Sequence, residues 1–129
     1  MDTTKLTVYW RDASEEKWKT AEALMKSERY ADALFFCHLT LEALLKAAVV
    51  VKTKEYPPYQ HDLVDLARRA GVSLDEKKTE ELAEITTFNI RARYDDFKLS
   101  FYRKATKEYA TRYFDTTNQL RIWIKNTLQ

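Results

Sequence analysis

The scarcity of glycine and proline is the feature that most limits what this chain can fold into. Its 129 residues contain one glycine, Gly71, and two adjacent prolines, Pro57 and Pro58. Tight β-hairpins depend on residues that accept positive φ angles, glycine above all. The sequence therefore predicts an all-α protein. It also excludes the P-loop and the dinucleotide-binding fingerprint, because both need several glycines at fixed spacing.

Length and composition predict a single domain over residues 1–129. Hydrophobic residues make up 45% of the chain and charged residues 33%, which is typical of a globular protein. One cysteine, Cys37, excludes an internal disulfide, and two histidines leave no cluster with structural-zinc spacing. We therefore expect no metal and no cofactor. Residues 1–11 lack the apolar core of a signal peptide, so we expect them to be an N-terminal tail of a cytoplasmic protein.

Hydrophobic periodicity predicts four substantial helices and one short helix, arranged as an up-and-down four-helix bundle. The first helix is expected to begin near Asp12 or Ser14, either of which can cap it. Gly71 is expected to end the short helix, and Asp75 to cap the next one. Residues 89–103 have an irregular pattern. The expected helices cover about residues 12–25, 30–53, 61–70, 76–88 and 104–128.

The second expected helix shows the strongest periodic signal. Its apolar seam comprises Tyr30, Leu34, Cys37, Leu41, Leu44, Ala48 and Val51. Phenylalanines and leucines outside this seam extend the apolar surface, so the helix must be covered on more than one side, by this domain or by a second subunit. The run resembles a membrane span, but three ionisable residues at its centre exclude that, because charge is costly in lipid.

Those three residues, His38, Glu42 and Lys46, are spaced by four and therefore form one polar file on the helix. Two interpretations are open. The file is either a surface ion pair or a partly buried group that must have partners, since unpaired buried charge is strongly disfavoured. Its burial decides between them. His61, at the start of the short helix, is expected to be a cap or a buried hydrogen-bonding partner.

A second group of polar residues comprises Arg91, Arg93, Tyr94 and Asp95. Arginine can bind phosphate in a fork, and tyrosine can stack on a base. Residues 91–112 contain seven Lys or Arg and three Asp or Glu, a local charge of +4, so the rest of the chain carries −2. This segment is therefore a candidate contact for a nucleotide or RNA, although its aromatic residues at helical spacing are more typical of a core.

The chain resembles the HEPN family, the higher eukaryotes and prokaryotes nucleotide-binding domains. The resemblance covers nearly the whole chain and rests on four segments in order. These are Tyr30-Ala31-Asp32-Ala33, then His38 with Glu42-Ala43-Leu44-Leu45-Lys46-Ala47, then His61-Asp62-Leu63 with Leu66, and last Arg91-Ala92-Arg93-Tyr94-Asp95. The resemblance implies a helical bundle that forms a homodimer, often encoded beside a minimal nucleotidyltransferase.

Many HEPN proteins resemble ribonucleases whose motif is an arginine followed four to six residues later by a histidine. This chain departs from that motif. The corresponding positions hold Asp96, Phe97 and Lys98 after Arg91, and Lys98, Leu99 and Ser100 after Arg93. Cleavage of RNA needs a group that accepts the 2′-hydroxyl proton, and the histidine is missing from its place. We therefore do not expect an enzyme with that motif.

Our leading hypothesis is a binding module with a substrate-binding or toxin–antitoxin-like role and no membrane association. It is a homodimer that holds a nucleotide or a nucleotidyltransferase partner. The expected binding residues are Arg91, Arg93, Tyr94, Asp95, His38, Glu42, Lys46 and His61. Two alternatives remain: a divergent metal-independent ribonuclease that uses His38 or His61, and a purely structural dimeric scaffold.

Overall fold

The computed structural model describes residues 2–90 and 94–128, and within these residues it contains six helices and no strand. The prediction of an all-α helical bundle is therefore confirmed. The second helix has the predicted bounds. The helices are α1 Thr4–Lys26, α2 Tyr30–Thr53, α3 Leu63–Arg69, α4 Glu76–Thr86, α5 Asp95–Lys104 and α6 Lys107–Thr127.

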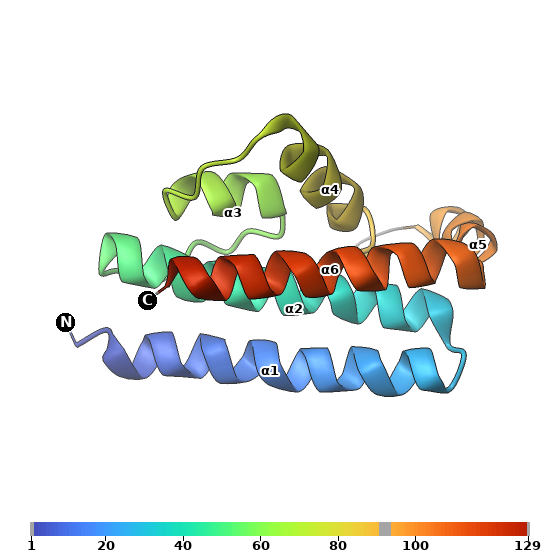
Figure 1. Ribbon diagram of the computed structural model, residues 1–129, viewed down its shortest axis with the longest axis horizontal. Helices are drawn as coiled ribbons and strands as arrows, with labels where there is room; N and C mark the ends of the chain where they lie inside the picture. The colour runs from blue at the N-terminus through green and yellow to red at the C-terminus, as the bar shows by residue number, and fades with distance from the viewer. Residues whose placement is uncertain (1, 91–93, 129) are drawn as a thin grey trace.

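The three long helices lie side by side, and the shorter helices complete the bundle (Figure 1). Helix α2 runs antiparallel to α1, with α6 beside it. Helices α3 and α4 lie across one face, and α5 lies at the end where α1 turns into α2. Because α3, α4 and α5 carry the chain back to that end, α6 runs in the same direction as α2 rather than alternating with it.

The first helix begins at Thr4, so the expectation of a start near Asp12 or Ser14 is wrong, and residues 4–11 are helical rather than a tail. The Asp2 carboxylate accepts a hydrogen bond from the Thr4 N–H at 2.9 Å. The Trp10 ring packs against the Lys46 ammonium of α2, 5.1 Å from the ring centroid. This contact between helices stabilises the first turns, and no local pattern reveals it.

The expectation of an irregular segment over residues 89–103 is also wrong in its second half, because α5 occupies Asp95–Lys104. Asp95 and Asp96 lie in the first turn of α5, and Arg103 and Lys104 lie in its last turn. Negative charge at the N-terminus and positive charge at the C-terminus both favour the helix dipole. The helix has only ten residues, so its hydrophobic pattern is too short to identify it. The charges at its two ends are the sequence signal that is consistent with a helix.

Local signals at the other helix ends are confirmed. The Asp75 carboxylate accepts from the Lys78 N–H at 2.8 Å and so caps α4. Gly71 follows α3 with a φ of +71°, the left-handed conformation that a glycine adopts without strain. The side chains of Asp62 and Thr106 cap α3 and α6 in the same way.

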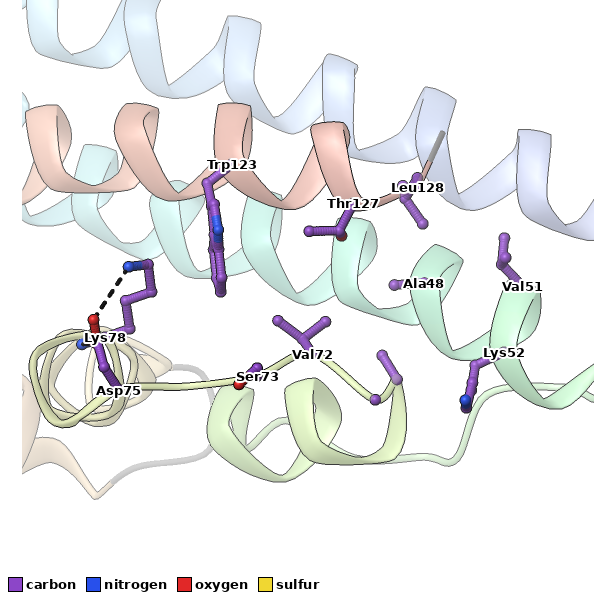
Figure 2. A pocket seen from close by; sticks show the side chains of 12 residues that line it. Ala48, Val51, Lys52, Val72, Ser73, Asp75, Lys78, Trp123, Thr127 and Leu128 are labelled. Atoms are coloured by element: carbon purple, nitrogen blue, oxygen red, sulfur yellow. Dashed lines mark hydrogen bonds and ion pairs between the residues drawn. The ribbon is translucent and has the colours of Figure 1, made fainter.

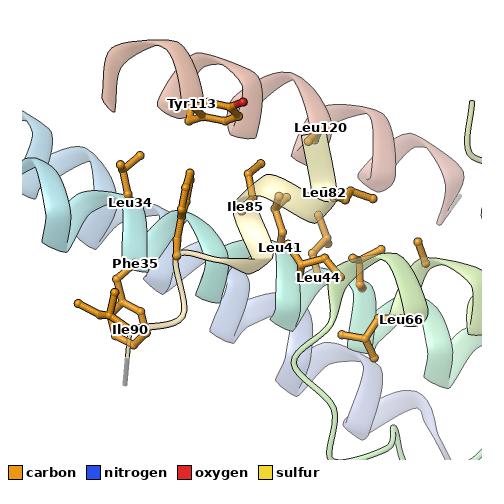
Figure 3. Packing of buried hydrophobic residues seen from close by; sticks show 14 of the residues in the cluster. Leu34, Phe35, Leu41, Leu44, Leu66, Leu82, Ile85, Ile90, Tyr113 and Leu120 are labelled. Carbon is orange, nitrogen blue, oxygen red and sulfur yellow. The ribbon is translucent and has the colours of Figure 1, made fainter. Parts of the chain in front are cut away.

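Helix α2 is the centre of the hydrophobic core (Figure 3). Five members of the predicted seam are buried: Leu34, Cys37, Leu41, Leu44 and Ala48. The seam weakens only at its ends, where Tyr30 is half-buried and Val51 is 37% exposed. Leu82, Ile85 and Phe88, predicted to face the core from the fourth expected helix, are fully buried.

The bundle itself covers α2 on more than one side, because α1, α3, α4 and α6 all pack against it. By length and composition, α2 is also the one described helix that could cross a membrane. Its most apolar window of 18 residues is 72% buried inside the protein. Helix α2 is therefore the core helix of a bundle.

Candidate functional site

The polar file of α2 is a buried network centred on the Glu42 carboxylate. Glu42 Oε1 accepts a hydrogen bond from Nδ1 of His61 at 2.8 Å, and Oε2 accepts one from Nζ of Lys46 at 3.3 Å. The His38 side chain is fully buried, and those of Lys46 and Glu42 are 6% and 12% exposed. Of the two interpretations, the buried group with partners is therefore confirmed. We call Glu42, His38, Lys46 and His61 the Glu42 network.

His38 holds the connection between α2 and α3 in place. Its Nε2 donates to the main-chain oxygen of His61 at 2.9 Å and lies 3.8 Å from Glu42 Oε1. Burial lowers the pKa of the His38 imidazole, because the charged form loses its hydration. His38 is therefore a neutral donor through Nε2. Its Nδ1 is buried and has no hydrogen-bond partner among the described residues.

Two aromatic rings lie near the Lys46 ammonium in addition to its carboxylate partner. Its ammonium lies 5.1 Å from the centroid of the Trp10 ring and 6.0 Å from that of the Tyr59 ring. A cation over a ring face is attracted by the ring quadrupole, most strongly in a desolvated position. The rings from α1 and from the α2–α3 connection thus compensate a charge that burial would otherwise disfavour.

His61 is the member of the Glu42 network that reaches solvent. Its side chain is 42% exposed, and its ring centroid lies 5.2 Å from that of Tyr59, which is itself 94% exposed. Because Nδ1 is bonded to Glu42, the other ring nitrogen, Nε2, faces outward from the pair. It forms no hydrogen bond with a described residue. A carboxylate that fixes an imidazole in this way leaves Nε2 able to exchange a hydrogen bond or a proton with a ligand.

The other predicted site residues lie apart from this network or outside the described residues. Tyr94 is the N-cap residue of α5 and is 88% exposed, and Asp95 beside it is also exposed. Arg91 and Arg93 lie outside the described residues. The segment that precedes them ends at Ile90, which packs near Phe35 of α2 (Figure 3). Of the predicted site residues that lie within the described ranges, the structure brings together His38, Glu42, Lys46 and His61.

Burial prevents His38 and Lys46 from contacting a ligand directly. With 5% or less of each residue exposed, neither offers a surface that a ligand can reach in a monomer. Both instead position Glu42 and His61. Trp10 and Tyr59 are the two residues of this region that sequence reasoning missed. Tyr59 could have been found from its position two residues before His61 in the sequence. The contact of Trp10 with Lys46 could not, because no residue near Trp10 in the sequence indicates it.

Cys37 is the small core residue that its place in the seam predicted. It is fully buried, and burial raises the pKa of its thiol to about 12, against a weaker opposing effect of a hydrogen bond with Thr117. A reactive thiolate is therefore disfavoured. Within residues 2–90 and 94–128, no group of three or more His, Cys, Asp or Glu side chains could hold a metal ion.

Comparison with known proteins identifies the family. The sequence model of the HEPN domain matches residues 7–127, which is nearly the whole chain. The chain belongs to the HEPN domain family. The Glu42 network therefore lies within a HEPN domain, as the resemblance of its four segments predicted. No curated protein matches this HEPN domain.

A solved structure shows the same fold. The crystal structure of the protein TT1696 from Thermus thermophilus matches this HEPN domain with a TM-score of 0.78. The match covers 98% of each chain at 19% sequence identity. At that identity the likeness establishes the helical architecture over the full length of both chains.

Proposed function

We propose that this HEPN domain is a nucleotide-binding module that works as a homodimer. The observation that carries the proposal is the His61 imidazole, half-exposed at the surface and fixed through Nδ1 by the buried carboxylate of Glu42. His61 and Tyr59 contact the ligand, while His38, Glu42 and Lys46 position them. Arg91, Arg93, Tyr94 and Asp95, which lie apart from the Glu42 network or outside the described residues, are proposed as further ligand contacts. A cytoplasmic setting suits the free thiol of Cys37.

The chemistry of the exposed groups fits a nucleotide. Because Nδ1–H of His61 is donated to Glu42, the outward nitrogen Nε2 accepts a hydrogen bond from a ribose hydroxyl when the ring is neutral and donates one to a phosphate oxygen when the ring is protonated. Arginines bind phosphate oxygens in a fork. The ring of Tyr59 is 94% exposed and offers a face on which a base can stack. Such stacking accepts any base, so the contact favours the nucleotide class rather than one member of it.

Exposed aromatic residues near His61 support the homodimer. Tyr9, Tyr56 and Tyr59 are 62%, 70% and 94% exposed. Tyr9 packs on Trp10 with ring centroids 5.1 Å apart, and Trp10 and Tyr59 both lie over Lys46. Aromatic residues are enriched where proteins associate, so these three exposed tyrosines are candidate contacts of an interface. A second copy of this HEPN domain is the proposed occupant, and a minimal nucleotidyltransferase is the alternative partner.

Calorimetric titration with AMP, ADP and ATP tests the proposal. Saturable binding is expected for the unaltered protein, and His61→Ala and Tyr59→Ala should each weaken it about tenfold or more, the size of one lost charged hydrogen bond or stacking contact. Tyr102→Ala is the matched control, because Tyr102 is 51% exposed on α5 and bonds Asp32 instead. Absence of binding to all three nucleotides sinks the proposal. Co-purification with a neighbouring nucleotidyltransferase would instead favour the partner alternative.

The pairing of His61 with Glu42 also favours a second candidate function, a divergent metal-independent ribonuclease. His61 Nε2 would take the proton of a ribose 2′-hydroxyl, whose oxygen then bonds to phosphorus while the bond to the leaving 5′-oxygen breaks. That leaving oxygen needs a proton from a further group of the site. RNA cleavage abolished by His61→Ala supports this candidate, and cleavage that survives the change points to a contaminating nuclease.

A further inference from the structure

A second site lies on a different face of α2 from the Glu42 network. It is a cavity of ≈ 710 Å³ between the C-terminal half of α2, the α3–α4 connection and the end of α6 (Figure 2). Cavities of 300–1,000 Å³ are the usual size for sites that bind small molecules. None of its lining residues belongs to the Glu42 network. A ligand here would therefore be independent of the proposed nucleotide site.

The walls of the cavity suit a flat apolar group. The Trp123 ring extends from α6 toward Val72 on the α3–α4 connection, and Ala48 and Val51 of α2 line the cavity farther from Trp123, toward Lys52 (Figure 2). Leu128, just beyond the end of α6, adds a further apolar side chain. Aromatic rings prefer offset-stacked or edge-to-face contacts with other rings, so Trp123 offers a planar ligand a specific partner.

The charges at the cavity are not balanced. Two lysines, Lys52 and Lys78, and one carboxylate, Asp75, line it, which leaves a net charge of +1. Asp75 already accepts from the Lys78 N–H at 2.8 Å and from Lys78 Nζ at 3.4 Å. Lys78 Nζ also lies 4.8 Å from the centroid of the Trp123 ring. The uncompensated charge is therefore that of Lys52, which forms no ion pair with a described residue.

The Lys52 side chain lies beside Gly71 at the edge of the cavity. A Cβ atom at position 71 would lie 3.3 Å from Cε of Lys52 and 3.6 Å from its Nζ, so a larger residue there would require only a small shift of the flexible lysine side chain. The Ser73 hydroxyl also lies on the lining and can donate a hydrogen bond to a bound oxygen, whereas the Thr127 hydroxyl already donates to the Ile124 main-chain oxygen. The ammonium of Lys52, which has no ion-pair partner within residues 2–90 and 94–128, is complementary to a carboxylate.

We propose that this cavity binds a small organic acid with a planar apolar body. The planar body packs against Trp123 and the apolar side chains of α2, and the carboxylate pairs with Lys52. An ammonium and a carboxylate form a charge-assisted hydrogen bond, about twice as strong as a neutral one. The Trp123 ring and the ammonium of Lys52, a cation without an ion-pair partner among the described residues, therefore determine the ligand class.

Three probes that share a naphthalene ring test the proposal: 2-naphthoate, 2-naphthylmethanol and 2-naphthylmethylamine. The protein has three tryptophans, Trp10, Trp18 and Trp123, so their indole N–H signals can be followed separately by NMR after assignment with Trp→Phe variants. 2-Naphthoate should shift the Trp123 signal saturably and leave those of Trp10 and Trp18 unchanged. The alcohol should bind at least about tenfold more weakly than 2-naphthoate, and the amine more weakly still, since each lacks the anion that pairs with Lys52.

Calorimetry on charge variants identifies the cation. Lys52→Gln should weaken 2-naphthoate binding about tenfold and leave binding of the alcohol unchanged. Lys26→Gln is the control, because Lys26 is an exposed lysine in the last turn of α1, distant from the cavity. Three results overturn the proposal: no shift of Trp123, equal affinity for the acid and the amine, or equal loss in both lysine variants.

Discussion

Glu42 shows how one carboxylate can hold a polar network inside a helical bundle. It bonds His61 and Lys46 through separate oxygens, while Trp10 and Tyr59 cover the lysine. Each buried polar atom of the Lys46–Glu42–His61 chain thus has a partner, which keeps the cost of burial low. Of the four residues of the Glu42 network, His61 is the most exposed, and its bond to Glu42 fixes the orientation of its imidazole.

Substitutions of the buried ion pair should cost unequal amounts of stability. Glu42→Gln is expected to lower the free energy of unfolding by about 3 kcal/mol, because it leaves the Lys46 ammonium buried without a counter-charge. Lys46→Met should cost less, since Glu42 keeps His61 as a partner. The double variant should be more stable than Glu42→Gln alone. Urea unfolding of the three variants measures this, and strictly additive costs would contradict the coupling.

The same experiment separates the scaffold alternative from the binding module. If the Glu42 network is purely structural, Lys46→Met should be neutral or stabilising and should leave nucleotide binding absent before and after. In the binding module, Lys46→Met should weaken nucleotide binding even where stability is kept, because Glu42 and His61 lose part of their support.

His38 should make the protein less stable in mild acid. Burial lowers the pKa of folded His38 below its ordinary value of 6.5, so below about pH 6.5 the unfolded chain binds a proton that the folded protein does not. The stabilising effect of the neutral form is complete above that pH. It decreases as the pH falls toward the folded pKa. Glu42, His61 and Lys46 are the charged or titratable groups nearest to His38.

Unfolding free energies measured between pH 7.5 and pH 5 in urea, on the unaltered protein and on His38→Gln, test this expectation. The glutamine variant lacks the titrating imidazole but keeps a side-chain N–H donor, so its stability should decline less steeply over the same range. Parallel curves for the two proteins would show that other groups are responsible for the pH dependence.

At the scale of helices, the shortage of glycine has left strained ends. Glu28 follows α1 with a φ of +61°, and Lys54 follows α2 with a φ of +60°. Only α3 is followed by a glycine in this conformation, Gly71. The left-handed region is costly for residues with a Cβ atom, by roughly 1 kcal/mol for a single position. Helices α1 and α2 are therefore each followed by a strained residue, and a glycine at that position would avoid the conformational free-energy cost.

Lys54→Gly should consequently stabilise the protein by roughly 1 kcal/mol, because glycine adopts the left-handed conformation without steric strain. Lys54→Ala removes the same charged side chain but keeps the Cβ atom, and it should give no gain. Thermal unfolding of both variants measures the difference. A glycine variant no more stable than the alanine variant would show that backbone strain at position 54 is negligible.

At the scale of the whole molecule, the exposed tyrosines near His61 bear on assembly. Light scattering coupled to gel filtration should give a molar mass near twice 15.3 kDa for the proposed homodimer. The double variant Tyr56→Ser/Tyr59→Ser should shift it toward the monomer, since it removes two aromatic side chains from the proposed contact. A single-chain mass for the unaltered protein at its highest soluble concentration would contradict the homodimer, although the nucleotide site would stand.

Some features could be predicted from the sequence because their causes are local. The bounds of α2, the caps by Asp75 and Gly71 and the buried seam around Leu41 all follow from residues within a few positions of each other. The all-α fold follows from the near absence of glycine for the same reason. The start of α1 and the presence of α5 were not predicted, because contacts between helices and the charges at the ends of α5 outweigh a weak hydrophobic pattern.

The polar file of α2 likewise has features that the sequence determines and features that only the tertiary structure determines. The sequence alone placed His38, Glu42 and Lys46 on one face, since a helix repeats every 3.6 residues. Only the tertiary structure decided that this face is buried, that His61 bonds Glu42 from 19 residues away, and that the rings of Trp10 and Tyr59 lie near the Lys46 ammonium. Those contacts depend on how separate helices and their connections pack, which periodicity within one helix does not determine.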